Sequence, residues 1–171
     1  IALGVLINAK LQAQLVPKPE IIVQVDEENA FITNEEMYRR LRLEGLLYDG
    51  QKREELDTEK IEAFIASISQ VRTVEVFQRI NGSWKINVEM RNPIARIFNL
   101  FGETFYLDDE GNTVETLGSH TARVLVFTGN IPDREVSIPT TEIINNDSLI
   151  SIRKLDDIYR ISDYVCKDPL F

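Results

Sequence analysis

The sequence has few of the residues that build catalytic or metal sites. Among its 171 residues are one histidine, His120, and one cysteine, Cys166. A metal site at His120 would need Asp, Glu or Cys ligands, and none stands at a recognisable spacing from it. A single cysteine excludes an internal disulfide framework and is compatible with any compartment. We therefore expect no metal, no cofactor and no disulfide.

Glycine-rich and basic stretches are also missing. The eight glycines stand singly, which excludes the loops that bind nucleotide phosphates through consecutive backbone amides. The formal net charge is −9, whereas a nucleic-acid binder needs a concentrated basic face to displace phosphate counterions. One short basic run, with Arg39, Arg40 and Arg42, stands among glutamates and is typical of a solvated helix face. We expect neither a nucleic-acid partner nor a small-molecule substrate.

Three clusters of side chains could still carry chemistry. Cys166 and His120 could form a nucleophilic dyad, but Cys166 stands near the end of a predicted helix, where a buried structural thiol is expected. The run Asp108–Glu110 could pair carboxylates for acid–base catalysis, but we expect it at a hairpin tip where nothing excludes water. The run Asp26–Glu28 lacks the alternating ligands and central glycine of a calcium loop and predicts a solvated turn. The sequence thus favours a protein that is not an enzyme.

The first half of the chain predicts a strand followed by two helices. A composition of 43% hydrophobic and 27% charged residues is that of a folded protein with one domain or two small ones. After a spacer with two prolines, the apolar residues 21–25 predict a strand. Thr33 and Glu36 have the spacing of a capping box, with Ile32 at the staple position, and they predict a helix that ends at Gly45.

Apolar periodicity gives the inward faces of both predicted helices. Met37 and Leu41, with Tyr38 beside them, form that of the first helix. A second helix is predicted from Asp57 or Thr58, because apolar residues recur at helical spacing on one face: Ile61, Phe64, Ile65 and Ile68. Such a stripe needs a sheet to cover.

Two strands supply that sheet. Alternation over residues 74–80 and 84–90 is the period-2 pattern of half-buried strands, and Asn81-Gly82 between them predicts a type I′ turn. Pro93 then stops the ladder, because proline has no N–H to donate. The predicted fold class is α+β, with a β-α-α-β-β module before Pro93.

The second half predicts a mostly antiparallel β module with a helix. Strands are expected over residues 94–98, 104–107, 113–117 and 122–127. A helix is expected from Asp147 as N-cap, with apolar residues at helical spacing toward Val165, and it must end by Asp168-Pro169. The apolar residues of that helix begin with Leu149, Ile152 and Leu155, and continue with Tyr159.

The segments WKINVEMRNPIARI, TFYLDDEGNTVETL and ARVLVFTGNIP resemble the FtsQ/DivIB cell-division proteins. The likeness covers residues 20–171 and depends on the order and spacing of elements. It implies a membrane-proximal segment or remnant of a transmembrane helix over 1–19, a POTRA-like domain over 20–92, and an FtsQ-type β domain over 93–171 that is incomplete at its C-terminus.

The same resemblance implies a function and a location. FtsQ/DivIB proteins are non-catalytic, have one transmembrane helix before the POTRA module, and link division proteins by binding partners of the FtsB and FtsL type. The apolar run Ile1–Ile7 is far shorter than the roughly 20 residues of a membrane span. It is either the trailing part of such a helix or a soluble or processed end. The resemblance implies a single-pass protein of the bacterial inner membrane, with this part on the extracytoplasmic, periplasmic side.

An exposed strand edge is the predicted binding site. In POTRA modules the strand that corresponds to residues 74–80 tends to lie at an edge, where a partner strand could add to the sheet. The candidate residues are Val74, Val76, Gln78 and Ile80. The alternative is that this edge is only solvated. The family's main site for FtsB, on the final strands of the β module, would fall after Phe171.

Two other functions stay open. One is a POTRA-containing component of outer-membrane protein assembly or polypeptide transport, which several tandem copies of the β-α-α-β-β unit would favour; the sequence contains one. The other is an envelope enzyme with its site in the β module, which would need titratable groups that converge in a pocket.

Overall fold

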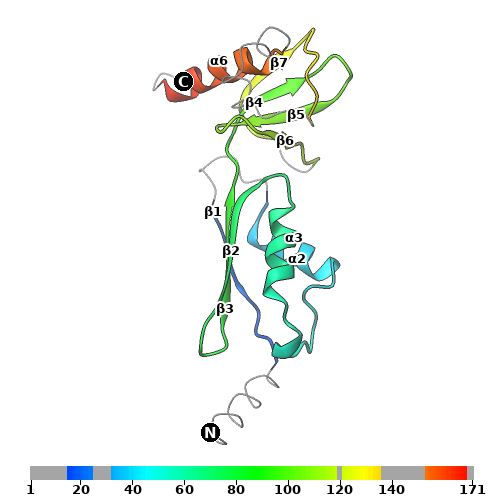
Figure 1. The fold of residues 1–171 in the computed structure, drawn as a ribbon, viewed down its shortest axis with the longest axis vertical. Helices are drawn as coiled ribbons and strands as arrows, with labels where there is room; N and C mark the ends of the chain where they lie inside the picture. Colours follow the sequence, from blue (N-terminus) through cyan, green and yellow to red (C-terminus); the bar gives the residue numbers. More distant parts are fainter. Residues whose placement is uncertain (1–14, 25–31, 119–120, 136–152, 169–171) are drawn as a thin grey trace, which may run out of the picture. The chain divides into compact units, whose positions relative to one another are not determined.

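The computed structural model describes residues 15–24, 32–118, 121–135 and 153–168 (Figure 1). Several sequence predictions fall outside the described residues: the apolar run Ile1–Ile7, the acidic run Asp26–Glu28, His120, and the Asp147 N-cap with Leu149 and Ile152 of the predicted helix. The described chain divides into two compact units, one with residues 15–24 and 32–90 and the other from Arg91 onward.

The first unit has a three-stranded sheet with two α-helices on one face (Figure 1). Its elements are β1 (Glu20–Gln24), α2 (Asn34–Leu43), the short 3-10 helix η1 (Arg53–Glu55), α3 (Thr58–Ala66), β2 (Val71–Gln78) and β3 (Trp84–Met90). The strand order is β1-β3-β2, with β1 parallel and β2 antiparallel to β3. This is the β-α-α-β-β order that the apolar periodicity predicted, and the α+β fold class is confirmed.

Helix α2 begins as predicted, but its capping box is only half formed. The Thr33 hydroxyl oxygen accepts the Glu36 N–H at 3.2 Å. The Glu36 carboxylate turns instead to Arg39 at 2.8 Å and Arg40 at 3.0 Å, and hydrogen bonds from these two guanidinium groups lower its pKa to about 2. Met37 and Leu41 are fully buried, as their spacing indicated.

Helix α3 has its predicted cap, but it ends at Ala66, so Ile68 of the predicted apolar stripe lies after the helix. The Asp57 carboxylate accepts the Lys60 N–H at 3.0 Å and starts the helix at Thr58. Ile61 and Ile65 are fully buried against the sheet.

On β3, every second residue from Trp84 to Met90 is buried. The Trp84 indole N–H donates to the Pro17 carbonyl at 2.7 Å, and this bond holds the N-terminal spacer on this unit.

The turn between β2 and β3 differs from the predicted type I′ turn. Arg79 donates its N–H to the Ser83 carbonyl at 2.8 Å and accepts from the Gly82 N–H at 3.0 Å, so the loop has three residues, Ile80 to Gly82. Gly82 has φ +89°, whereas Asn81 does not have positive φ. A type I′ turn needs positive φ at both central residues. A three-residue loop needs it only once, and glycine adopts it without strain.

The second unit has a four-stranded sheet with one helix. Its elements are β4 (Pro93–Phe98), β5 (Thr104–Asp108), β6 (Thr113–Glu115), β7 (Leu125–Thr128) and α6 (Leu155–Lys167). The strand order is β6-β5-β4-β7, antiparallel except that β7 runs parallel to β4. A cluster of buried apolar residues joins this sheet to α6: Ala95, Ile97, Phe105, Leu107, Ile131, Leu155 and Ile158.

Three predicted boundaries in this unit differ from the structure by two residues or more. Strand β6 ends at Glu115 rather than Leu117, and β7 begins at Leu125 rather than Ala122. Residues 153 and 154 precede α6 and are not helical, so α6 does not run continuously from Asp147. The Asp133 carboxylate explains the start of α6, because it binds the Arg153 guanidinium at 2.8 Å and accepts the Lys154 N–H at 2.9 Å. The helix is therefore capped by a residue distant in sequence.

Candidate partner-binding site

Strand β2 lies at an edge of the first sheet, with unpaired backbone directed outward. It pairs with β3 on one side only, whereas β3 is enclosed between β1 and β2. The Arg79 N–H donates to the carbonyl of Ser83, the residue just before β3. Bonding direction alternates from residue to residue along an antiparallel ladder, so Glu75 and Phe77 also direct their N–H and C=O groups toward β3. Val74, Val76 and Gln78 then direct theirs outward.

One of these outward groups has a partner within the unit. The Val76 N–H donates to Glu62 Oε2 on α3 at 3.3 Å. The opposite edge is capped in the same way, since the Val23 N–H donates to Asn34 Oδ1 on α2 at 3.1 Å. Each edge is thus partly protected by one side chain, which is a common way to limit unwanted strand pairing. In the described part of the chain, no side chain bonds the outward groups of Val74 or Gln78.

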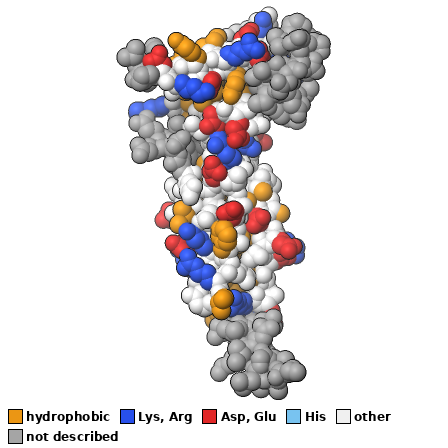
Figure 2. All heavy atoms as spheres, turned by 60° about the vertical axis from the view of Figure 1, so that its left-hand side comes forward, with side chains coloured by type: hydrophobic (Ala, Val, Ile, Leu, Met, Phe, Trp, Pro, Cys, Tyr) orange, Lys and Arg blue, Asp and Glu red, His pale blue; other side chains and the backbone are white. Residues whose placement is uncertain are grey.

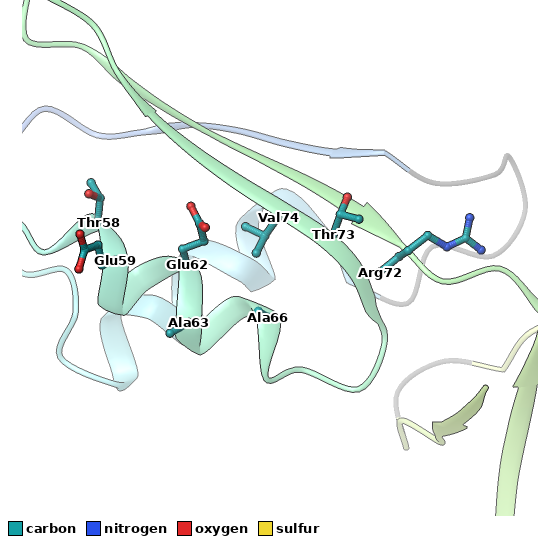
Figure 3. Close-up of a pocket in the computed structure, with 8 residues that line it drawn as sticks. All are labelled: Thr58, Glu59, Glu62, Ala63, Ala66, Arg72, Thr73 and Val74. Carbon is teal, nitrogen blue, oxygen red and sulfur yellow. The ribbon is translucent and has the colours of Figure 1, made fainter. Parts of the chain in front are cut away.

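A groove runs beside β2, between this strand and α3 (Figure 3). It has a volume of about 470 Å³ and is lined by Thr58, Glu59, Glu62, Ala63, Ala66, Arg72, Thr73 and Val74. In Figure 3, Glu62 extends from α3 toward the strand, and Val74 points from the strand toward the helix. A smaller groove of about 180 Å³ lies beside β1. Strand β2 has eight residues and β1 has five, so β2 offers the longer edge and the larger groove.

The register is disturbed where β2 begins. Val71 lies opposite Met90 and Thr73 opposite Glu89, so Arg72 is the extra residue of a bulge. The Arg72 guanidinium lies 3.6 Å from Glu89 on β3 and extends away from α3 (Figure 3). The regular edge of β2 therefore extends from Thr73 to Gln78.

Three of the four predicted site residues lie on this edge, and one does not. Val74 and Val76 are half-buried and Gln78 is exposed, all within β2. Ile80 was assigned to the strand because it continues the alternation of Val74 and Val76, but it lies in the hairpin loop and is 98% exposed. Its backbone is therefore not part of the strand edge to which a partner strand could pair. Whether the other three bind a partner stays a prediction.

The residues that sequence reasoning missed are those of the groove wall on α3, above all Glu59 and Glu62. Both are exposed, and their helical spacing marks them only as part of a solvated face. Nothing in the local sequence shows that this face lies beside a strand edge, because that depends on how α3 packs on the sheet.

The catalytic candidates have other surroundings than expected. Cys166 was predicted to be buried, but it is exposed on the last turn of α6. Partial desolvation of the sulfur, followed by the charges of Asp163 and Asp109, raises the pKa of the thiol, which disfavours the thiolate needed by a nucleophile. The described residues contain no group of three or more His, Cys, Asp and Glu side chains that could hold a metal ion.

Asp108 was predicted to be open to water at the hairpin tip, and that was wrong. Its side chain is 0% exposed and lies 2.8 Å from Arg91. It also accepts the Asn112 N–H at 2.6 Å and the Glu110 N–H at 3.0 Å. The carboxylate is thus engaged by Arg91 and by the backbone of its own hairpin.

Neither sign of charge dominates the face of the described residues that Figure 2 shows. On the face in Figure 2, Lys and Arg side chains alternate with Asp and Glu side chains. None of the helices in the described ranges has the length and hydropathy of a membrane span.

Two family models match the chain, one for each compact unit. Residues 17–89 match the POTRA-like domain. Residues 92–171 match the family described as FtsQ/DivIB, C-terminal related. No curated protein matches the chain.

Proposed function

We propose that this chain, which is of the FtsQ/DivIB type with a POTRA-like domain followed by the C-terminal related module, is a scaffold that recruits and links division proteins during septum formation. The two domain types indicate a role in cell division. Such a scaffold works by contact and needs no catalytic group. Its partners are division proteins of the FtsB and FtsL type.

The observation that carries this proposal is the β2 edge. An extended partner segment can add to a sheet by bonding the outward N–H and C=O groups of the edge strand, while its side chains enter pockets beside it. Val74, Val76 and Gln78 present those backbone groups, and the groove between β2 and α3 receives the side chains. Exposed edges are otherwise shortened or covered, whereas β2 has eight residues.

Proline at position 76 tests this mode of binding. In Val76→Pro the outward N–H is lost, but the bonds to β3 remain, because those come from the neighbouring residues Glu75 and Phe77. We expect the variant to fold and to recover about two- to tenfold less of its division-protein partners in a pull-down, since an edge hydrogen bond contributes about 0.5–1.5 kcal/mol.

The control is Val23→Pro, which removes an outward N–H from the opposite edge of the same sheet. We expect it to leave recovery of the division proteins unchanged. Circular dichroism checks that both variants are folded. Full recovery by a folded Val76→Pro variant would exclude β2 as the binding edge.

We also propose that the full-length protein crosses the bacterial inner membrane once, with these two modules on the extracytoplasmic side. The domain order supports this location, because FtsQ/DivIB proteins place a POTRA module directly after one transmembrane helix. A phosphatase that is active only outside the cytoplasm, fused to the C-terminus of the full-length protein in cells, should be active. An inactive fusion that is expressed at a normal level would contradict this orientation.

A further inference from the structure

We infer that the groove beside β2 selects a partner segment with basic side chains at two alternate positions and an apolar side chain at the next alternate position. This inference rests on the proposed function, since it describes the chemistry of a strand that adds to the β2 edge. It follows from the order of side chains along the groove.

Helix α3 and strand β2 run in opposite directions along the groove. The bond between Glu62 and the Val76 N–H fixes their relative register. Ala66 and Ala63, which follow Glu62 on α3, lie toward the start of β2 near Val74, and all three line the groove. Glu59, one turn before Glu62, lies toward the end of β2. The groove is therefore lined by small apolar side chains at one end and by the two glutamates at the other.

The geometry of a sheet decides which partner side chains enter this groove. Residues directly opposite each other on neighbouring strands have side chains on the same face. Val74 faces α3, and Val76 and Gln78 share its face because they follow at a period of two. Partner residues opposite these three positions therefore point toward α3, and the residues between them point to the other face.

The acidic end of the groove has charge available for a partner. In the part of the chain that the structure describes, neither Glu59 nor Glu62 forms an ion pair. Arg72 also lines the groove, but its guanidinium extends away from α3 toward Glu89 (Figure 3). A lysine or arginine opposite Val76 or Gln78 would meet these two carboxylates, whereas an acidic residue there would be repelled.

Glu62 also affects which partner strands can bind to the β2 edge. A partner strand needs the Val76 N–H for its own carbonyl, so Glu62 must release it. A basic partner side chain gives the released carboxylate a new ion pair, and a neutral one does not. Glu62 therefore disfavours strands in general and favours basic ones, which combines edge protection with selection.

The partner pattern can be written for both directions. An antiparallel partner would read basic, any, basic, any, apolar from its N-terminus, and a parallel partner would read the reverse. The apolar residue would lie against Val74, Ala63 and Ala66, where small side chains leave room for it.

A peptide array tests this pattern with the whole chain. Each peptide has threonine at the positions that point away from α3, and the positions that point toward α3 are varied among lysine, glutamine, glutamate and valine. Every pattern is made in the antiparallel and in the parallel order. We expect the lysine-lysine-valine peptides to bind the protein about tenfold more tightly than their glutamate counterparts, because two exposed ion pairs together contribute about 1–2 kcal/mol. The preference should weaken as salt is raised, since these charges are solvated.

The variant Glu59→Gln/Glu62→Gln removes the charges and keeps an oxygen that can accept the Val76 N–H. We expect it to bind the lysine and glutamine peptides equally well. The matched control is Glu75→Gln, which removes a charge from the exposed face of the same strand and should retain the lysine preference.

The outcomes separate this inference from the proposed function. The inference would be overturned if the protein bound the peptides without a preference for lysine, or if Glu75→Gln lost that preference as well. In either case β2 would still be the binding edge if Val76→Pro abolished peptide binding. Binding that Val76→Pro leaves unchanged would overturn the edge itself, and so would the absence of binding by every peptide.

Discussion

The surroundings of Asp108 differ from what its neighbours in sequence indicate. It stands at the start of the run Asp-Asp-Glu-Gly-Asn, which is typical of an exposed turn. Its buried carboxylate nevertheless binds the Arg91 guanidinium and the backbone of the hairpin that it begins. A buried ion pair is costly to break on one side, because the remaining charge has no partner.

We therefore expect Asp108→Ala to lower the free energy of unfolding by about 3 kcal/mol. The change leaves Arg91, which is 23% exposed, without its closest carboxylate and removes the acceptor for two backbone N–H groups. Urea unfolding followed by circular dichroism measures the effect.

The control for this prediction is Glu110→Ala. Glu110 lies 3.6 Å from the same guanidinium but is 52% exposed, so its loss should cost at most about 1 kcal/mol. Equal effects of the two substitutions would mean that the burial of Asp108 contributes nothing to stability.

At the scale of the element, the loop between β2 and β3 depends on one backbone conformation. Gly82 has φ +89°, and a Cβ added there would lie 3.3 Å from Arg53 Nη1. Both features favour glycine, although a flexible guanidinium can move.

We expect Gly82→Ala to lower the free energy of unfolding by about 1–2 kcal/mol. The comparison is Gly82→Asn, which should recover part of that loss, because asparagine tolerates positive φ better than alanine. Denaturant unfolding followed by the fluorescence of Trp84 measures both variants. If Ala and Asn were equally destabilising, a steric contact rather than the φ value would set the cost.

At the scale of the whole molecule, each compact unit has its own buried apolar core. Ile61 and Ile65 are fully buried in the first unit, and Ile97 is fully buried in the second. Trp84, the one tryptophan of the chain, lies in the first unit and is 3% exposed. Its fluorescence therefore reports on the first unit alone.

We expect Ile61→Ala and Ile97→Ala to destabilise different units, each by about 2–5 kcal/mol through the cavity they leave. Ile61→Ala should shift the unfolding midpoint reported by Trp84, and Ile97→Ala should not. Circular dichroism, which reports on both units, should detect both changes. A similar shift of the Trp84 midpoint in Ile97→Ala would show that the two units unfold together.

Much of the fold followed from the sequence because it is encoded locally. Thr33 and Asp57 cap their helices through their own side chains, and alternation from Trp84 to Met90 gives the buried face of β3 directly. Helix α6 shows the limit. Its start is set by Asp133, about twenty residues earlier in the chain, so no local signal could place it.

The candidate site was predictable only in part. The family resemblance, rather than any pattern, indicated that the strand around Val76 lies at an edge. Alternation shows which face of a strand is buried, but the order of side chains does not show which backbone groups bond to a neighbouring strand. Ile80 continues the alternation of Val74 and Val76 and was therefore assigned to the strand, whereas β2 ends at Gln78.

The order of the elements and most of their inward faces can be predicted from the amino-acid sequence, which also contains no recognisable catalytic motif. Short-range periodicity and capping make this possible, because both depend on neighbours in the chain. Two features depend on tertiary packing: β1 pairs with β3 and leaves β2 at the edge, and Glu62 lies beside Val76. These two facts create the groove. They result from packing between segments far apart in sequence, which no local pattern records.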